Sequence, residues 1–409
     1  MRMLFLAARN LTRNLRRTVL TLVAIAFGLG MMMMMVTLQS GQYKVMLEQA
    51  ISTQAGHVVV ENVKYTEEAE PEYVVPGASG VVAAIGAAVP GAVVAPRIQM
   101  PGLISSPKNS VGVGMRGLDP EAEAAVTEME DKIVRGEWLR KDDPQGVLLG
   151  VNLADRLGVD IGEKVVFMGQ ASGREVESRL LRVRGVFKSG SSELDSFMAL
   201  SNLEPVQIVL GTPDAVHQIT VHIEDPTRSE AVRDVVKGLI PQGTHALTWN
   251  EALPDLVAFI RLDRVSGDIM MLVLGAIVAM GVLNTILMSV LERTREFGVL
   301  LALGMRPRRI AGLVLLEGLV LGILGGGLGF LFGCALSWYL VVYGLDYTAF
   351  IGESMEMEGI VISALMKGAW DIPRSLQFVL MAVVFTVAAS VYPAWHLFRL
   401  RPVEAMRQA

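Results

Sequence analysis

The sequence predicts a polytopic α-helical membrane protein with four transmembrane helices, arranged as one plus three, and a large α+β extracytoplasmic domain between the first and the second of them. Of the 409 residues, 52% are hydrophobic and only 19% are charged, whereas about a quarter of a soluble domain is charged. Four long apolar runs stand out, and a long segment of soluble character separates the first from the other three. Basic residues gather in the segments that alternate with this one, as membrane crossing requires.

The first predicted span covers residues 19–40. Its core, from Val19 to Leu38, contains no charged residue, and a helix of this length crosses ~30 Å of hydrocarbon. The preceding segment 1–18 holds five arginines and no acid, which resembles the start of a signal peptide. The apolar run is too long for one and has no small-residue cleavage site, so we expect an uncleaved first span.

Three further spans are predicted over residues 269–291, 310–343 and 376–398. The first and last of these runs are uncharged, and the middle one contains a single ionisable residue, Glu317. Each is long enough to cross the hydrocarbon core.

The charges of the flanking segments predict the orientation. Segments 1–18, 292–309 and 399–409 have an excess of basic residues, and segments 41–268 and 344–375 have an excess of acidic residues. Because short cytoplasmic segments are enriched in Lys and Arg, we expect both termini and the 292–309 link to be cytoplasmic. The two acidic segments then face outward.

The outward segment 41–268 shows short apolar stretches separated by Gly- and Pro-containing turns, a mixture typical of an α+β domain. We expect strands over 56–63, 146–150, 164–168, 180–187 and 218–223, and helices over 78–88, 151–157 and 230–239. The ends of the segment, 42–53 and 251–268, have helical patterns and are expected to extend the first two spans as a stalk.

Composition and motifs argue against catalysis by this chain. A net charge of −5 argues against nucleic-acid binding, and the single cysteine, Cys334, excludes a disulfide framework and a multi-thiolate metal site. No phosphate-binding P-loop, zinc-protease motif or nucleophile elbow occurs. His217 and His222 are five residues apart around a predicted strand, a poor spacing for a metal. We therefore expect no enzyme activity and no bound cofactor or metal.

The link between the second and third spans has an apolar face. Phe297, Leu300, Leu301 and Gly304 follow the i, i+3, i+4, i+7 spacing of one helix side. Such a helix lies on the membrane surface, or its apolar face enters a groove of a cytoplasmic partner. The pattern alone leaves both alternatives open.

Three features inside the spans have a structural and a functional interpretation. Glycines form two helical rows, favouring close helix packing over a ligand site: Gly318, Gly322 and Gly326, then Gly325, Gly329 and Gly333. Glu317 is expected to reach the cytoplasmic interface or to pair with an arginine there. Five methionines, Met31, Met32, Met33, Met34 and Met35, suit either a wall of an acyl-chain site or a lipid-facing surface.

Several of these stretches together resemble the FtsX/MacB-type (type VII) ABC transporter permeases. They are the link ERTREFGVLLALGMRPRRI, the following Leu316-Glu317-Gly318, the tail from Tyr392 to Arg407, the start Ala8–Thr18 and Gly56–Val60. Residues 136–150 and 153–164 are most similar to the lipoprotein-releasing branch, with LolC- and LolE-like members.

The resemblance implies a bacterial inner-membrane permease that forms a dimer with a second copy or a homologue. Two copies of a separate cytoplasmic ATPase would bind ATP and Mg²⁺. A coupling helix would dock on that ATPase, with Phe297 and Leu300 as anchors, and would include Glu292, Arg293, Thr294, Arg295, Glu296, Phe297, Gly298, Leu300, Leu301 and Gly304. The outward domain would have a porter-like part with a subdomain inserted at about 106–213, and its stalks would transmit motion.

Three functions remain open under this resemblance. The leading one is extraction of a lipoprotein or lipid from the outer leaflet, with Met31–Met35 as the candidate lining and a periplasmic carrier or adaptor as a further partner. The second is MacB-like efflux of a small molecule or peptide, although such exporters usually carry a fused ATPase. The third is a signalling relay that activates an extracytoplasmic enzyme.

Overall fold

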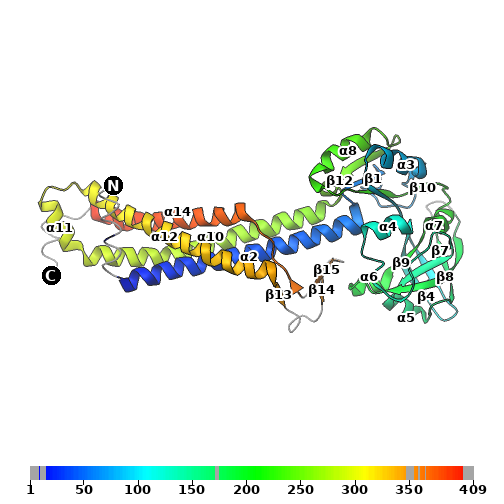
Figure 1. Cartoon of the computed structure of the whole chain (residues 1–409), viewed down its shortest axis with the longest axis horizontal. Helices are drawn as coiled ribbons and strands as arrows, with labels where there is room; N and C mark the ends of the chain where they lie inside the picture. Colours follow the sequence, from blue (N-terminus) through cyan, green and yellow to red (C-terminus); the bar gives the residue numbers. More distant parts are fainter. Residues whose placement is uncertain are drawn as a thin grey trace. The chain divides into compact units, whose positions relative to one another are not determined.

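The computed structural model of the chain describes residue 9 and residues 15–170, 175–346, 354–357, 360–363 and 365–398. It divides into two compact units (Figure 1). The helix unit comprises Met1–Lys44, Phe259–Phe350 and Ala364–Ala409, and the sheet unit comprises Val45–Ala258 and Ile351–Ser363. The predicted tail 399–409 and most of segment 1–18 lie outside the described residues.

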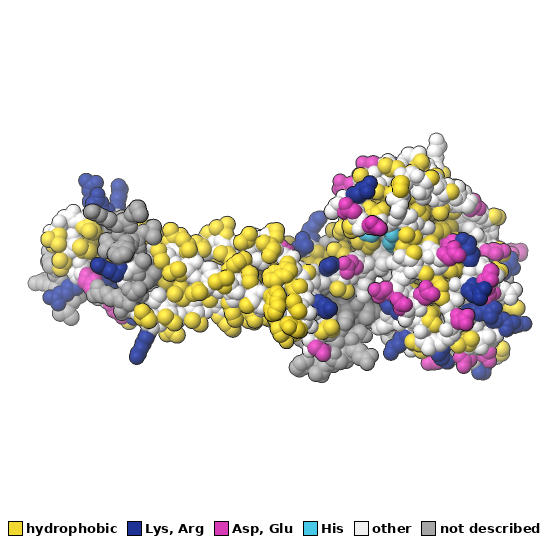
Figure 2. Space-filling view, viewed as in Figure 1, with side chains coloured by type: hydrophobic (Ala, Val, Ile, Leu, Met, Phe, Trp, Pro, Cys, Tyr) yellow, Lys and Arg dark blue, Asp and Glu magenta, His cyan; other side chains and the backbone are white. Residues whose placement is uncertain are grey.

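Four helices are long and apolar enough to cross a membrane. They are α2 (Leu15–Ala50), α10 (Pro254–Glu292), α12 (Pro307–Val342) and α14 (Ile372–Phe398). Large apolar side chains remain exposed on them, such as Leu20, Met280 and Leu380, and hydrophobic atoms cover the surface of these helices in Figure 2. Since exposing this surface to water costs about 25 cal/mol per Å², it fits a lipid environment. The chain is a multi-pass membrane protein.

The first two spanning helices are longer than the predicted spans. Helix α2 continues to Ala50, a π-helical turn η1 (Ile51–Ala55) follows, and Gly56 at φ 64° ends it. The stalk predicted from residue 251 is divided in two, because α9 (Trp249–Ala252) ends before Pro254 opens α10. Proline is favourable at the first turn of a helix but donates no backbone hydrogen bond to continue a preceding one.

Short elements connect the third and fourth spans. The strands are β13 (Leu345–Asp346), β14 (Ser354–Met357), β15 (Ile360–Ser363) and β16 (Leu365–Met366). Strand β13 pairs with β16 and β14 pairs with β15, both antiparallel.

A ten-stranded sheet organises the sheet unit. Its strands are β1 (Val58–Asn62), β3 (Val93–Ser105), β4 (Ser110–Leu118), β5 (Ile133–Gly136), β6 (Gly146–Gly150), β7 (Lys164–Gly169), β8 (Glu177–Phe187), β9 (Met198–Asn202), β11 (Gln218–His222) and β12 (Thr244–Thr248). The order is β12-β1-β11-β3-β4-β9-β6-β8-β5, and β7 pairs with β3 and β8. A separate short pair consists of β2 (Val75–Pro76) and β10 (Ala215–Val216).

The β3–β4 hairpin joins the two halves of this sheet. Its register runs from Arg97 opposite Leu118 to Ser105 opposite Ser110. On one side β3 pairs with β11, and on the other β4 pairs in parallel with β9. The proposed insertion at about 106–213 therefore begins in the turn of this hairpin and shares its sheet with the rest of the unit.

Short helices pack against the sheet. They are α3 (Ala78–Ala88), α4 (Pro120–Val126), α5 (Val151–Leu157), α6 (Ser192–Phe197), α7 (Leu203–Leu210), the turn η2 (Pro226–Arg228) and α8 (Ser229–Lys237). One core cluster links Ile85 of α3, Leu153 of α5 and Val236 of α8 to strand residues such as Ile98 and Leu149, all fully buried.

The predicted fold class is confirmed, and each strand and helix predicted in the outward segment is present. Strand β6 and helices α3 and α5 have the predicted ends, and the ends of the others are shifted. The β3–β4 hairpin was not predicted. Pro96, Pro101 and Gly102 lie in β3, and Gly112 and Gly114 lie in β4. These residue types are depleted in strands, so local composition hid the element that joins the sheet.

Candidate functional site

The link between the second and third spans forms a short helix. Helix α10 ends at Glu292, α11 spans Thr294–Ala302, and Gly304 at φ 90° redirects the chain before Pro307 begins α12. The hydroxyl of Thr294 donates to the carbonyl of Val290 at 3.1 Å, which ties the start of α11 to the end of α10.

The large apolar side chains of the predicted face pack against the interior of the helix bundle. Phe297 is only 1% exposed and packs with α10, α12 and α14 in one core cluster. The ring of Phe297, one of the two anchors that the resemblance implies, fills the end of the helix bundle. Leu300 and Leu301 are half-buried, whereas Leu303 is 80% exposed and Val299 is also exposed.

Glu317 forms a buried ion pair with the start of the link. Its carboxylate accepts a hydrogen bond from Arg293 Nη1 at 3.0 Å, and its side chain is 7% exposed. Arg293 also donates from Nε to Glu296 at 3.3 Å and lies over the ring of Phe297. Pairing with an arginine was one of the two structural roles predicted for Glu317. The pair holds α11 against α12.

The two glycine rows lie at contacts with different helices. A Cβ atom added to Gly325 or Gly329 would come within 2.9 Å of Ile25 or Leu29 of α2. In the other row, a Cβ added to Gly322 would lie 3.3 Å from Thr386 of α14. Because no side chain separates the backbones, α12 packs closely against both neighbours.

The five methionines do not share one environment. Met33 is fully buried and packs on Gly333, whereas Met31 and Met35 are exposed. Met32 lines an apolar crevice of about 30 Å³ between α2, α10 and α14, together with Met271 and Phe378. Met33 therefore belongs to the bundle interior. The candidates for lining an acyl-chain site are then Met31, Met32, Met34 and Met35.

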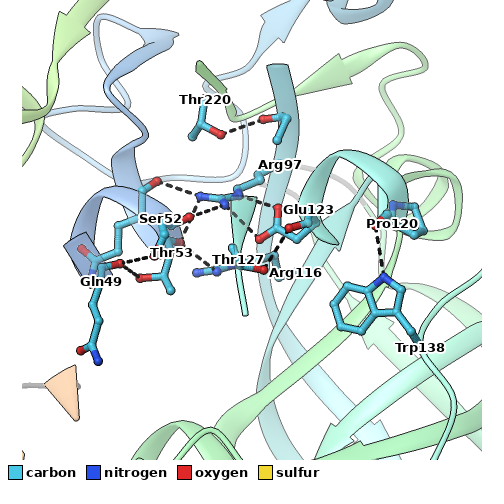
Figure 3. Close-up of polar contacts among 12 residues, drawn as sticks. Gln49, Ser52, Thr53, Arg97, Arg116, Pro120, Glu123, Thr127, Trp138 and Thr220 are labelled. Atoms are coloured by element: carbon cyan, nitrogen blue, oxygen red, sulfur yellow. Dashed lines mark hydrogen bonds and ion pairs between the residues drawn. The ribbon is translucent and has the colours of Figure 1, made fainter. Parts of the chain in front are cut away.

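A cluster of charged side chains in the sheet unit holds the end of the first long helix (Figure 3). Arg97 is completely buried and donates to both carboxylate oxygens of Glu123, each at 2.9 Å. It also donates to the carbonyls of Ser52, Thr53 and Gln54 at 2.8–3.2 Å. Arg116 donates to Thr53 O at 3.1 Å. We call Arg97, Arg116, Glu123 and these three carbonyls the arginine joint.

The arginine joint satisfies groups that a helix end leaves open. The last carbonyls of a helix have no intrahelical partner and carry the negative end of its dipole, so two guanidinium groups are favourable there. Burial, followed by the neighbouring Arg97, lowers the pKa of Arg116 to about 10. Burial also lowers the pKa of His222 to about 3, with further contributions from Arg97 and His57.

Two family models match the chain. The FtsX-like permease C-terminal model matches residues 269–402, and the MacB-like periplasmic core domain model matches residues 18–239, more than half of the chain. The chain belongs to the FtsX/MacB-type ABC transporter permeases.

Relatives of this permease include two kinds of transporter. It is 26% identical to the lipoprotein-releasing system transmembrane protein LolC of Xylella fastidiosa, over 76% of this chain and 77% of that protein. It is 27% identical to the macrolide export ATP-binding/permease protein MacB of Nitrobacter winogradskyi, over 66% of this chain and 40% of that protein. The crystal structure of the periplasmic region of MacB from Actinobacillus actinomycetemcomitans is 15% identical with a TM-score of 0.37, covering 50% of this chain and 94% of that one.

The arginine joint of this permease was missed by sequence reasoning. The only local signal is one arginine within the apolar stretch VVAPRIQM, and nothing in that stretch identifies Glu123 or residues 52–54 as partners. Among the described residues, no cluster of His, Cys, Asp or Glu suited to a metal occurs.

Proposed function

We propose that this permease extracts a lipoprotein or lipid from the outer leaflet of the bacterial inner membrane, driven by a separate cytoplasmic ATPase. The observation that carries the proposal is the similarity to LolC, which extends over about three quarters of both chains. Within the FtsX/MacB-type permeases this similarity favours lipoprotein release over other substrates.

Energy enters through α11 in this proposal. Leu303 and Val299 offer an exposed apolar surface, and Arg306, Arg308 and Arg309 beside them are exposed as well. An apolar patch with a basic rim fits a groove on a protein partner. The buried side of α11, through Phe297 and the Arg293–Glu317 pair, connects a movement of this helix to the bundle.

The arginine joint is the proposed point of transmission to the sheet unit. Helix α2 runs without a break from Leu15 to Ala50, and the joint binds the carbonyls that directly follow it to β3, β4 and α4. A buried ion pair with several charge-assisted hydrogen bonds resists displacement more than a surface pair does. A shift of the helix end is therefore passed to the sheet.

The substrate chains are proposed to contact α2 and α10. Met32 and Met271 line the crevice between these helices, and Met31 and Met35 are exposed on α2. Methionine adapts to apolar chains of varied shape, which suits acyl chains.

The test is reconstitution of the permease with its ATPase in proteoliposomes that contain an acylated lipoprotein. We expect ATP-dependent release of the lipoprotein to a soluble carrier. Replacing both Met32 and Met34 with Asp lowers release about tenfold or more, because a carboxylate beside an acyl chain costs a few kcal/mol, while ATPase binding is retained.

The matched control is the double variant Leu328→Asp with Leu331→Asp, which places the same two charges at exposed positions of α12 and is expected to leave release unchanged. Normal release by the double methionine variant would contradict the proposed substrate path. A complex that releases no lipoprotein but exports a macrolide would support the alternative suggested by the similarity to MacB.

A further inference from the structure

A polar cavity lies beside the arginine joint within the sheet unit. Its volume is about 220 Å³, against about 30 Å³ for the crevice between the spanning helices. Residues 49–54 form one wall, and β4, α4, α6 and β9 form the others. The cavity is somewhat smaller than the ~300–1,000 Å³ of a pocket for a drug-sized molecule, so it has room for a small ligand.

Two cationic side chains line this cavity. Arg116 and Lys132 both face it, and Glu123 is the acidic residue among its lining. Both oxygens of Glu123 already accept hydrogen bonds from Arg97, at 2.9 Å each. Among the residues that the structure describes, neither Arg116 nor Lys132 has a carboxylate within ion-pair distance. The cavity therefore has an excess of positive charge.

One buried donor of Arg116 has no hydrogen-bond acceptor in the described structure. Its Nη1 donates to the Thr53 carbonyl at 3.1 Å, but its Nε is buried without a hydrogen-bond partner in the described structure. An unpaired buried donor of a charged group costs a few kcal/mol, and such groups are rare in folded proteins. Although burial lowers its pKa to about 10, Arg116 stays protonated at neutral pH. An anion beside Arg116 would accept from the free donor and compensate the charge.

Part of the cavity lining is apolar. Met129, Leu194, Met198 and Leu200 provide this surface, and the remaining lining is largely uncharged amide and hydroxyl groups. A purely inorganic anion would leave the apolar wall without contact, and a neutral apolar ligand would leave the cations unpaired. A molecule with an acidic head and a short apolar part satisfies both sides.

We propose that this cavity binds a small amphiphilic anion whose carboxylate or phosphate lies between Arg116 and Lys132 and whose apolar part lies against Met129, Met198 and Leu200. Because the cavity is lined by Gln49, Thr53 and Gln54 as well as by α6 and β9, a bound anion links the end of the first long helix to the far half of the sheet. Binding requires neither the ATPase nor transport, so it is tested independently of the proposed function.

The test is isothermal titration of the full-length protein in nanodiscs of neutral phosphatidylcholine. Hexyl phosphate is expected to bind with one site per chain, hexanol not to bind, and inorganic phosphate to bind more weakly. Lys132→Gln is expected to weaken hexyl phosphate about tenfold, the typical effect of losing one charge-assisted hydrogen bond. Arg116→Gln should weaken it at least as much.

Matched variants distinguish binding of the ligand's acidic group from binding of its apolar part. Lys164→Gln removes an exposed cation that does not line the cavity, so it should leave affinity unchanged. Met198→Ser should weaken hexyl phosphate but not inorganic phosphate. Tighter binding of dodecyl phosphate supplied in the bilayer than of aqueous hexyl phosphate would identify a lipid as the source of the anion, and the reverse would identify a soluble acid.

The proposal is overturned if hexyl phosphate fails to bind at millimolar concentration or if Lys132→Gln binds it as tightly as the unmodified protein. Equal affinity for hexyl phosphate and inorganic phosphate would refute the amphiphilic ligand. Arg116 is part of the arginine joint, so its substitution can also disturb folding. Lys132 has no side-chain hydrogen bond or ion pair among the described residues, and its variant keeps the test decisive.

Discussion

At the scale of single residues, Arg97 serves two purposes. It is the partner of a buried carboxylate and also the cap of a helix end. Each of these groups alone would be costly to bury, and together they satisfy one another. The joint depends on residues 52–54, 97 and 123, which are far apart in the sequence, and this is why no local pattern revealed it.

Arg97→Met is expected to lower the free energy of unfolding by about 3–5 kcal/mol, because Glu123 then stays buried without a cation. For a unit of this size the melting temperature falls by about 6–20 °C. Thermal unfolding of the full chain in detergent measures this. The double variant with Glu123→Gln should lose less than the sum of the single variants.

An exposed arginine is the control for this series. Arg228→Met removes an exposed guanidinium and should change the melting temperature little. A wild-type melting temperature for Arg97→Met would show that the joint does not stabilise the fold.

His222 predicts the pH dependence of stability. Its folded pKa is about 3, whereas the unfolded side chain titrates near 6.5. Between these values the unfolded state binds the proton, so stability is full above about pH 6.5 and falls as the pH is lowered towards 3. In this range the contribution of His222 to the free energy of unfolding falls by up to about 1.4 kcal/mol for each pH unit.

His222→Gln should flatten this dependence, measured as unfolding midpoints at pH 7, 6 and 5. If the His222 variant and the unmodified protein lose stability in parallel on acidification, the assignment is wrong.

At the scale of elements, α11 illustrates how a sequence pattern can predict which residues of a helix share a face without predicting what covers that face. The i, i+3, i+4, i+7 spacing predicted one apolar face, and Phe297, Leu300 and Leu301 all pack against the bundle. Leu303, which lies outside that pattern, is exposed. Periodicity identifies which residues share a face, but only packing decides which neighbour covers it.

Leu303→Asp is expected to abolish co-purification of the ATPase while leaving the melting temperature unchanged, since Leu303 is 80% exposed. Phe297→Ala should instead lower the free energy of unfolding by about 3–5 kcal/mol, because it leaves a cavity in the bundle. A pull-down and a melting curve for each variant separate the two effects.

Leu180→Asp, an exposed apolar position of the sheet unit, is the matched control and should bind the ATPase normally. Normal ATPase binding by Leu303→Asp would remove this surface from the proposed interface.

The glycine rows of α12 also show that the sequence predicts a packing face, whereas the structure decides which helix packs on it. The spacing of Gly318, Gly322 and Gly326 against Gly325, Gly329 and Gly333 predicted two close-packing faces. The structure assigns the first row to α14 and the second to α2. Small residues permit a close approach, but the partner depends on the arrangement of all four helices.

At the scale of the whole molecule, the composition separates clearly into two units. The spanning helices carry exposed apolar side chains, and the sheet unit carries most of the charge (Figure 2). Four helices that can cross a membrane were predicted and are found. The soluble elements predicted between the first two spans are also present, although the hairpin that unites them was hidden by proline and glycine.

The sequence by itself determined the four spans, the 1+3 arrangement and the fold class, because hydrophobicity along a run of residues is a local property that the bilayer makes decisive. Only the tertiary structure decided that Phe297 is interior, that Arg97 joins the turn η1 after α2 to Glu123, and that Arg116 and Lys132 share a cavity. These are contacts between distant residues, and their energies depend on burial and on neighbouring charges that no single stretch of sequence contains.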